Sequence, residues 1–175
     1  MAITPDTKDW TWVIERRCPE CGFDASTLEL DEVGDMARTN AGIWAEVLER
    51  PDVAVRPDAA TWSPLEYACH VRDVHNVFAE RLVLMMTHDD PEFADWDQDA
   101  AAEAGAYAEQ DPRDVSTQLM EAAFGTAEAF DAVPAEYAAR TGLRSNGSRF
   151  TIETLGRYYA HDLVHHAWDV TRDRG

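Results

Sequence analysis

The chain has 175 residues with 15 basic and 34 acidic side chains, which gives a formal net charge of −19. This length and a hydrophobic content of 45% suit one globular domain, which we place over residues 1–175. An acidic surface repels a phosphate backbone, so DNA and RNA are excluded as expected partners. Lys8 is the only lysine, and the chain contains no Walker A loop.

Neither a membrane span nor a targeting segment is predicted. The longest apolar run in the middle of the chain, Leu82–Met86, is far shorter than the ~18 residues that a span needs. Residues 1–10 contain charged side chains and lack the apolar stretch of a secretory leader. We therefore expect a cytoplasmic protein that does not contact the membrane.

The first half of the chain predicts an arm and two helices. Residues 1–24 show no sustained period, so we expect an ordered arm that packs on the body of the protein. Apolar residues then recur at helical spacing over residues 27–50, where Ser26 is available as a cap. The next helix begins at Ser63-Pro64-Leu65-Glu66, because Ser63 and Glu66 can form a capping box, and it continues to about His88.

The second half predicts two further helices separated by loops. Residues 91–110 are acidic and rich in alanine, which indicates a loop with one short helix at most. A second cap-plus-proline signal at Asp111-Pro112 starts a helix that ends before Pro134. Residues 140–149 form a turn-rich loop, and the last helix runs from after Thr151 to about Arg172.

These elements predict an all-α fold. Four long amphipathic helices with no convincing strand period favour an antiparallel four-helix bundle with an N-terminal arm. The last helix has apolar residues on more than one side. The arm can cover one of these sides and a partner chain another, so we expect a homodimer.

Two histidines on the last helix are candidate metal ligands. His161 and His165 are spaced i, i+4, which places their side chains on one face of the helix. A catalytic site for a divalent ion usually takes three protein ligands, and His70 in the second helix is the candidate for the third. On spacing alone, such a pair is more often two partly exposed polar residues.

Residues 62–70 read WSPLEYACH, and His161-x-x-x-His165 follows on the last long helix. In these two motifs the sequence resembles the DinB-like, or YfiT-like, metalloenzyme superfamily. The resemblance covers nearly the whole chain and implies a four-helix bundle with an up-down-down-up arrangement. It also implies a three-histidine site for one divalent ion, most often zinc or nickel, with His70, His161 and His165 as the ligands.

The resemblance implies a reaction class as well. Several members resemble transferases or isomerases that use a low-molecular-weight thiol, mycothiol or bacillithiol, and act on a small electrophilic substrate. A divalent ion lowers the pKa of a coordinated thiol or water, so it can supply a nucleophile at neutral pH. Thiol S-transfer is therefore the leading expectation, hydrolysis is the second, and a non-catalytic metal-binding or interaction bundle is the third. No catalytic side chain is assigned.

Several polar residues flank the predicted ligands. Asp73, Asp162, His166 and Asp169 could each orient an imidazole by accepting or donating a hydrogen bond. Because His166 follows His165 directly, it could also replace it as a ligand. Most acidic residues in a chain of this charge simply face solvent.

Cys18 and Cys21 form the pattern Cys-Pro-Glu-Cys-Gly, which resembles half of a zinc ribbon. The second cysteine pair of a ribbon is missing. Three interpretations therefore stay open: two ordinary thiols, a reversible disulfide, or a secondary zinc site completed by histidines such as His75 or His88.

Overall fold

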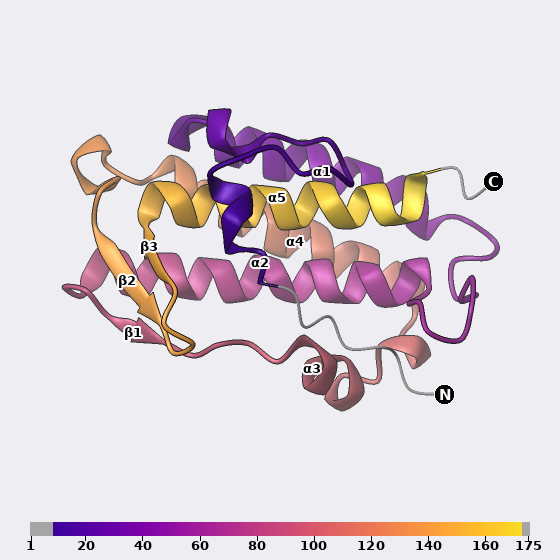
Figure 1. Ribbon diagram of the computed structural model, residues 1–175. Helices are drawn as coiled ribbons and strands as arrows, with labels where there is room; N and C mark the ends of the chain where they lie inside the picture. The colour runs from indigo at the N-terminus through magenta and orange to yellow at the C-terminus, as the bar shows by residue number, and fades with distance from the viewer. Residues whose placement is uncertain (1–8, 173–175) are drawn as a thin grey trace.

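The computed structural model describes residues 9–172 of the chain, and four long helices make up most of this range. They are α1 (Val33–Leu48), α2 (Pro64–Thr87), α4 (Pro112–Asp131) and α5 (Ile152–Thr171). The four helices lie side by side (Figure 1). The all-α four-helix bundle that the hydrophobic periodicity predicts is confirmed.

The direction of the helices follows the expected up-down-down-up order. Figure 1 shows α1 and α5 running one way along the bundle while α2 and α4 run the other way. The most extensive packing joins α1 to α4 and α5, and joins α2 to the same two helices. Helices α2 and α5, which carry the predicted metal ligands, are therefore direct neighbours.

The predicted start of α2 is confirmed in detail. The Ser63 hydroxyl accepts a hydrogen bond from the Glu66 backbone N–H at 3.2 Å, and the Glu66 carboxylate accepts one from the Ser63 N–H at 2.8 Å. Arg56 pairs with the same carboxylate. This capping box fixes the register of α2 and hence the depth at which His70 enters the bundle.

Helix α1 begins six residues later than predicted. Two short 3₁₀ turns, Ala25–Thr27 and Leu30–Glu32, precede it. Ser26 does not cap a helix, because its hydroxyl donates to the Asp24 carboxylate at 2.5 Å. Glu29 between the turns is extended, with a ψ of 155°, and its backbone N–H donates to the Glu32 carboxylate at 2.9 Å.

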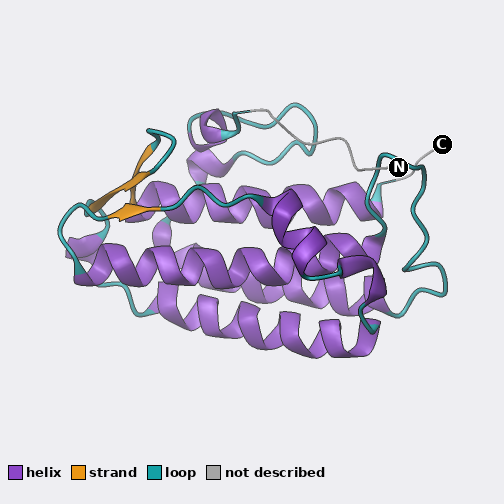
Figure 2. Cartoon of the chain, turned by 90° about the horizontal axis from the view of Figure 1, so that it is seen from below, coloured by secondary structure: helices purple, strands orange, loops and turns teal. Residues whose placement is uncertain are grey.

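A small sheet at one end of the bundle corrects the expectation of no strands (Figure 2). Strand β1 (Glu92–Phe93) runs parallel to β2 (Thr141–Arg144), and β2 pairs antiparallel with β3 (Arg149–Thr151). The predicted loop 140–149 thus contains a hairpin, whose turn is closed at Gly147 with a φ of 95°. Between residues 91 and 110 the structure has the expected short α-helix, α3 (Gln98–Ala104), followed by a 3₁₀ turn at Tyr107–Glu109.

Aromatic pairs and buried hydrogen bonds hold the helices of the bundle together. The rings of Phe130 and Tyr159 stack with centroids 5.4 Å apart. Asn40 donates to the Leu163 carbonyl at 2.9 Å and accepts from the Trp44 indole at 3.0 Å, which ties α1 to α5. The hydrogen bonds offset the cost of burying these groups, and the link fixes how α5 sits against α1.

The N-terminal arm crosses α5 (Figure 1). Within its described part, residues 9–24, a 3₁₀ turn at Thr11–Ile14 packs on α5, and Val13 and Cys18 are fully buried. The arm therefore covers one side of α5, as the sequence predicts. Among the helices of residues 9–172, none combines the length and apolarity that crossing a membrane would need.

Candidate metal centres

Two pairs of polar residues project from neighbouring faces of α5. His161 and His165 form one i, i+4 pair. Asp162 and His166, each one residue further along the helix, form a second pair with the same spacing. One residue turns a helix by about 100°, so the two pairs point in different directions. In the described part of the chain, each pair meets donor atoms from a different element.

The first cluster, here called the α2–α5 group, consists of His70, Asp162 and His166. Its three ligand atoms all lie within 4.8 Å of one another. The Asp162 carboxylate oxygen Oδ1 is 3.6 Å from His70 Nε2 and 3.3 Å from His166 Nε2. Two imidazoles and one carboxylate therefore converge on one point between α2 and α5.

Burial leaves part of this group without hydrogen-bond partners. His70 is 1% exposed, and within residues 9–172 neither of its ring nitrogens has a hydrogen-bond partner. The same holds for Oδ1 of Asp162. Burial lowers the pKa of His70, so its imidazole is neutral at pH 7. Burial opposes the charge of Asp162, but the imidazoles of His70 and His166 outweigh it and hold the pKa of that carboxyl at about 2.

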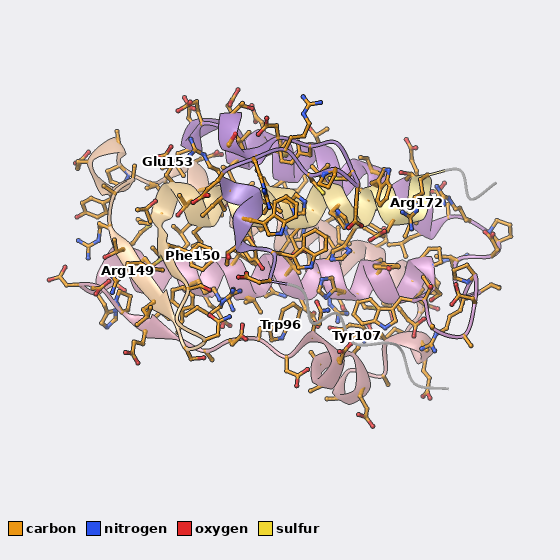
Figure 3. The ribbon with its side chains drawn as sticks, viewed as in Figure 1. Trp96, Tyr107, Arg149, Phe150, Glu153 and Arg172 are labelled. Atoms are coloured by element: carbon orange, nitrogen blue, oxygen red, sulfur yellow. The ribbon has the colours of Figure 1, made fainter. Side chains whose placement is uncertain are left out.

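Neighbouring side chains hold the group in position. His166 Nδ1 lies 3.2 Å from the Asp169 carboxylate, which directs Nε2 of the same ring toward Asp162. The Trp96 ring stacks on His70 with centroids 5.2 Å apart and an interplanar angle of 14°. Figure 3 shows Trp96 on the side of the bundle where the segment before α3 passes α2.

The second cluster, here called the arm–α5 group, consists of Cys18, Cys21, His161 and His165. Cys18 Sγ is 3.8 Å from His165 Nδ1, and Cys21 Sγ is 3.8 Å from His161 Nε2. Both cysteines are free thiols. The cysteine pair therefore contacts His161 and His165 of α5 and not His75 or His88, the two examples that the sequence suggested.

Burial keeps Cys21, His161 and His165 of the arm–α5 group neutral in the absence of a cation. Burial raises the pKa of the Cys21 thiol to about 11. Burial and the neighbouring His165 lower the pKa of His161 to about 4, and burial lowers the pKa of His165 as well. Neutral imidazoles keep a lone pair available, which is the form that binds a metal ion.

A cavity of about 630 Å³ opens beside both groups. Its wall includes Asp162 and His166 from one group and His161 and His165 from the other. The rest of the wall is mostly polar or aromatic, with contributions from the arm, the α3 segment and the sheet hairpin, among them Asp9, Trp10, Trp62, Asp95, Trp96, Arg144 and Tyr158. A small molecule in this cavity would contact both groups.

The predicted ligands His70, His161 and His165 are thus divided between the two groups. The residues expected to flank them are also divided. Asp162 and His166 lie in the α2–α5 group, and Asp169 contacts His166. Asp73 belongs to neither group, because it pairs with Arg72 at 2.8 Å and accepts from the Tyr107 hydroxyl. The three-histidine ligand set stays a prediction.

Trp96 and Arg144 are among the cavity residues that were missed from the sequence. Trp96 lies in the segment predicted as a loop, and Arg144 lies in β2, a strand that the periodicity did not reveal. Trp96 is one of the few large apolar residues between residues 91 and 110, and this isolation was the only available signal.

The fold and the buried donor groups together define a class of protein. It is a four-helix bundle in which side chains that can bind a metal ion lie beside a cavity at α2 and α5. Comparison with solved structures gives a particular relative, YfiT from Bacillus subtilis, which is described as "a probable metal-dependent hydrolase with an unusual four-helix bundle topology". The match has a TM-score of 0.67 at 16% identity and covers 98% of this chain and 93% of YfiT. The chain therefore has the YfiT/DinB-like fold. No family model and no curated protein sequence matches it.

Proposed function

We propose that this protein is a divalent-metal-dependent enzyme whose ion is held by His70, Asp162 and His166. The observation that supports this most strongly is that the buried ring nitrogens of His70 and Oδ1 of Asp162 lie close together yet make no hydrogen bond in the described structure. A buried polar atom without a partner costs about 1–3 kcal/mol. A cation at the point where these atoms converge would remove that cost.

The donor atoms fit a divalent ion in number and spacing. Bond lengths of ~2.0–2.2 Å in a tetrahedral site place neighbouring nitrogen and oxygen ligands roughly 3.4 Å apart. The distances from Asp162 Oδ1 to the two imidazoles are 3.3 Å and 3.6 Å. Two imidazoles and one carboxylate occur in zinc hydrolases and in other catalytic sites with open positions. Zinc or nickel is the ion we propose.

The remaining residues of the site orient the ligands and shape the cavity. A divalent ion bound there would lower the pKa of a coordinated thiol or water and so supply a nucleophile near neutral pH. Asp169 holds His166 with Nε2 directed inward, which is the usual role of a carboxylate behind a ligand histidine. Trp96 restricts the rotation of His70 by stacking on it.

The cavity favours a reaction between two small molecules. A volume of about 630 Å³ can hold a thiol cosubstrate and a small electrophile together. Arg144 and the aromatic rings of the wall offer contacts to a polar thiol of the mycothiol or bacillithiol type. We therefore propose S-transfer or isomerisation with such a thiol as the first reaction. Metal-dependent hydrolysis is the second, and it is favoured by the description of YfiT.

Metal analysis of variants tests the ligand set. Asp162→Ala and His166→Ala are expected to lose one ion per chain, whereas the exposed His88→Ala is expected to retain it. If His70, His161 and His165 are the ligands instead, Asp162→Ala retains its full metal content and His161→Ala loses the ion that His70 also binds. Metal content unchanged in both Asp162→Ala and His166→Ala would refute the proposed site.

A nucleophile screen tests the reaction. The metal-loaded protein is incubated with a small electrophile and mycothiol, bacillithiol or glutathione, and separately with ester and amide substrates. Conjugation that is lost in Asp162→Ala and retained in His88→Ala supports S-transfer. Ester or amide cleavage with the same dependence supports hydrolysis. No turnover of either kind by a fully loaded protein would favour a non-catalytic metal-binding bundle.

A further inference from the structure

We infer that Cys18, Cys21, His161 and His165 form a second, closed zinc site that fastens the N-terminal arm to α5. This site lies beside the proposed catalytic ion and shares no ligand with it. The resemblance to the DinB-like family implies one ion per chain, so a protein with both sites would carry two.

The cysteine turn presents both sulfurs to α5. The Gly22 backbone N–H donates to the Cys18 carbonyl at 3.0 Å, and the Cys18 N–H donates to the Phe23 carbonyl at 2.8 Å. Gly22 has a φ of +76°, a left-handed conformation that glycine adopts without strain. The turn is therefore closed on itself, and it brings Cys18 and Cys21 to the same pair of histidines.

The spacing of the four donors is that of a tetrahedral site. Zinc–sulfur bonds of ~2.3 Å and zinc–nitrogen bonds of ~2.0 Å place neighbouring sulfur and nitrogen ligands roughly 3.6 Å apart. The two sulfur–nitrogen distances are both 3.8 Å. All four ligand atoms lie within 4.8 Å of one another, so the two contacts at 3.8 Å are already near the tetrahedral spacing, and any wider pair would close by about 1 Å when the ion binds.

The chemistry of the donors selects zinc and a structural role. Two thiolates neutralise the charge of a divalent ion, and two cysteines with two histidines are a common structural zinc set. Four protein ligands leave no open position for a substrate. The α2–α5 group differs on both points, since it has three ligands and no sulfur.

The inferred zinc would position one wall of the cavity. The Trp10 ring lies 4.9 Å from His165 and 5.6 Å from His161, centroid to centroid, and both Trp10 and Asp9 line the cavity. The arm reaches α5 through the 3₁₀ turn at Thr11–Ile14 and through the cysteine turn. Removal of the zinc would therefore release this wall while the bundle itself stays folded.

Zinc analysis and X-ray absorption of the full-length protein test the site. Cys18→Ser/Cys21→Ser is expected to lose one zinc per chain, and Cys69→Ser, at the buried third cysteine in α2, is expected to retain it. In Asp162→Ala only the second site is expected to be occupied. The extended fine structure at the zinc edge of this variant should then show two sulfurs at ~2.3 Å and two nitrogens at ~2.0 Å. A zinc coordination shell without sulfur would overturn the inference. A freshly purified protein with a Cys18–Cys21 disulfide and no zinc would do the same.

Limited proteolysis gives a second readout that does not depend on activity. Arg17 precedes Cys18 and is exposed, so trypsin can reach the bond between them once the arm detaches. Chelation is expected to speed cleavage after Arg17 by about tenfold or more in the wild type, and not in the double serine variant, whose arm is already released. Cleavage after Arg149, in the hairpin, is the internal reference. Equal rates with and without zinc in the wild type would contradict the role in fastening the arm.

The two proposals fail separately. Asp162→Ala removes the proposed catalytic ion and leaves the sulfur signal, whereas the double serine variant removes the sulfur signal and leaves the catalytic ion.

Discussion

Acid stability should depend on one histidine in the core of the bundle. His75 is 0% exposed, and its Nδ1 lies 2.5 Å from the Tyr159 hydroxyl. Its other ring nitrogen has no hydrogen-bond partner within residues 9–172. Burial lowers the pKa of His75 to about 3, so the folded protein keeps this imidazole neutral well into the acid range.

The unfolded chain behaves differently, because its histidines titrate with a pKa near ~6.5. Between pH 6.5 and 4.5 the unfolded state therefore binds a proton at His75 that the folded state does not bind. One proton changes the free energy of unfolding by about 1.4 kcal/mol per pH unit. The free energy of unfolding therefore does not depend on the titration of His75 above about pH 6.5. Below that pH it falls as the unfolded state takes up the proton, by about 3 kcal/mol at pH 4.5.

His75→Asn removes this titration and keeps a polar partner for Tyr159. At pH 7 we expect the variant to be less stable than the wild type by about 1–3 kcal/mol, because the smaller side chain packs less well. At pH 4.5 the wild type has lost about 3 kcal/mol that the variant keeps, so the variant should then be about as stable as the wild type or more stable. The assay is urea unfolding of metal-free protein at several pH values between 7 and 4.5.

His88→Asn is the matched control, because His88 is exposed in the folded protein and lies outside the core. Its unfolding free energy should follow that of the wild type at every pH. Parallel curves for the wild type and His75→Asn would refute the argument, since they would show that His75 takes up no extra proton on unfolding.

Two glycines of α1 should respond in opposite directions to replacement by alanine. A Cβ at Gly34 would clash with the Asp131 carboxylate and lie 3.1 Å from the Ala127 carbonyl oxygen. Gly34→Ala should therefore lower the free energy of unfolding by about 1–3 kcal/mol, and the thermal midpoint should fall with it. A Cβ at the exposed Gly42 has nothing within 4 Å, so Gly42→Ala should raise stability by up to about 1 kcal/mol in the same assay. We also expect a homodimer, which light scattering at micromolar concentration would show as twice the chain mass of 19.6 kDa; a mass equal to that of one chain would mean that the arm alone covers α5.

Local signals predicted those parts of the fold that are fixed by a few consecutive residues. The capping box at Ser63 and the cap-plus-proline signal at Asp111 place the starts of α2 and α4, because a helix start is satisfied by side chains within the first turn. The sheet could not be predicted in this way. Its strands are two to four residues long, and β1 pairs with β2 across a wide sequence separation, as in Glu92 with Leu143.

The candidate sites were predicted only in part for a similar reason. The i, i+4 spacing of His161 and His165 is visible in the sequence, and so is that of Asp162 and His166. Which pair meets α2 and which meets the arm depends on the rotation of α5 about its own axis. That rotation is set by tertiary packing, such as the link from Asn40 to the Leu163 carbonyl.

The partners of the cysteine pair were beyond sequence reasoning. Cys18 and Cys21 precede the bundle, and His161 and His165 lie on its last helix. The Cys-x-x-Cys pattern predicts two ligands but does not specify the others. Only the path of the arm across α5 brings the four donors together.

Anomalous diffraction from a crystal of the metal-loaded protein, recorded at the absorption edge of the bound ion, tests the proposed site most directly. We expect an anomalous peak among His70, Asp162 and His166, within ~2.0–2.2 Å of one atom from each side chain. A fully loaded protein with no peak there, or with its ion bound by His161 and His165 alone, would contradict the proposal that the α2–α5 group is the metal centre of this protein.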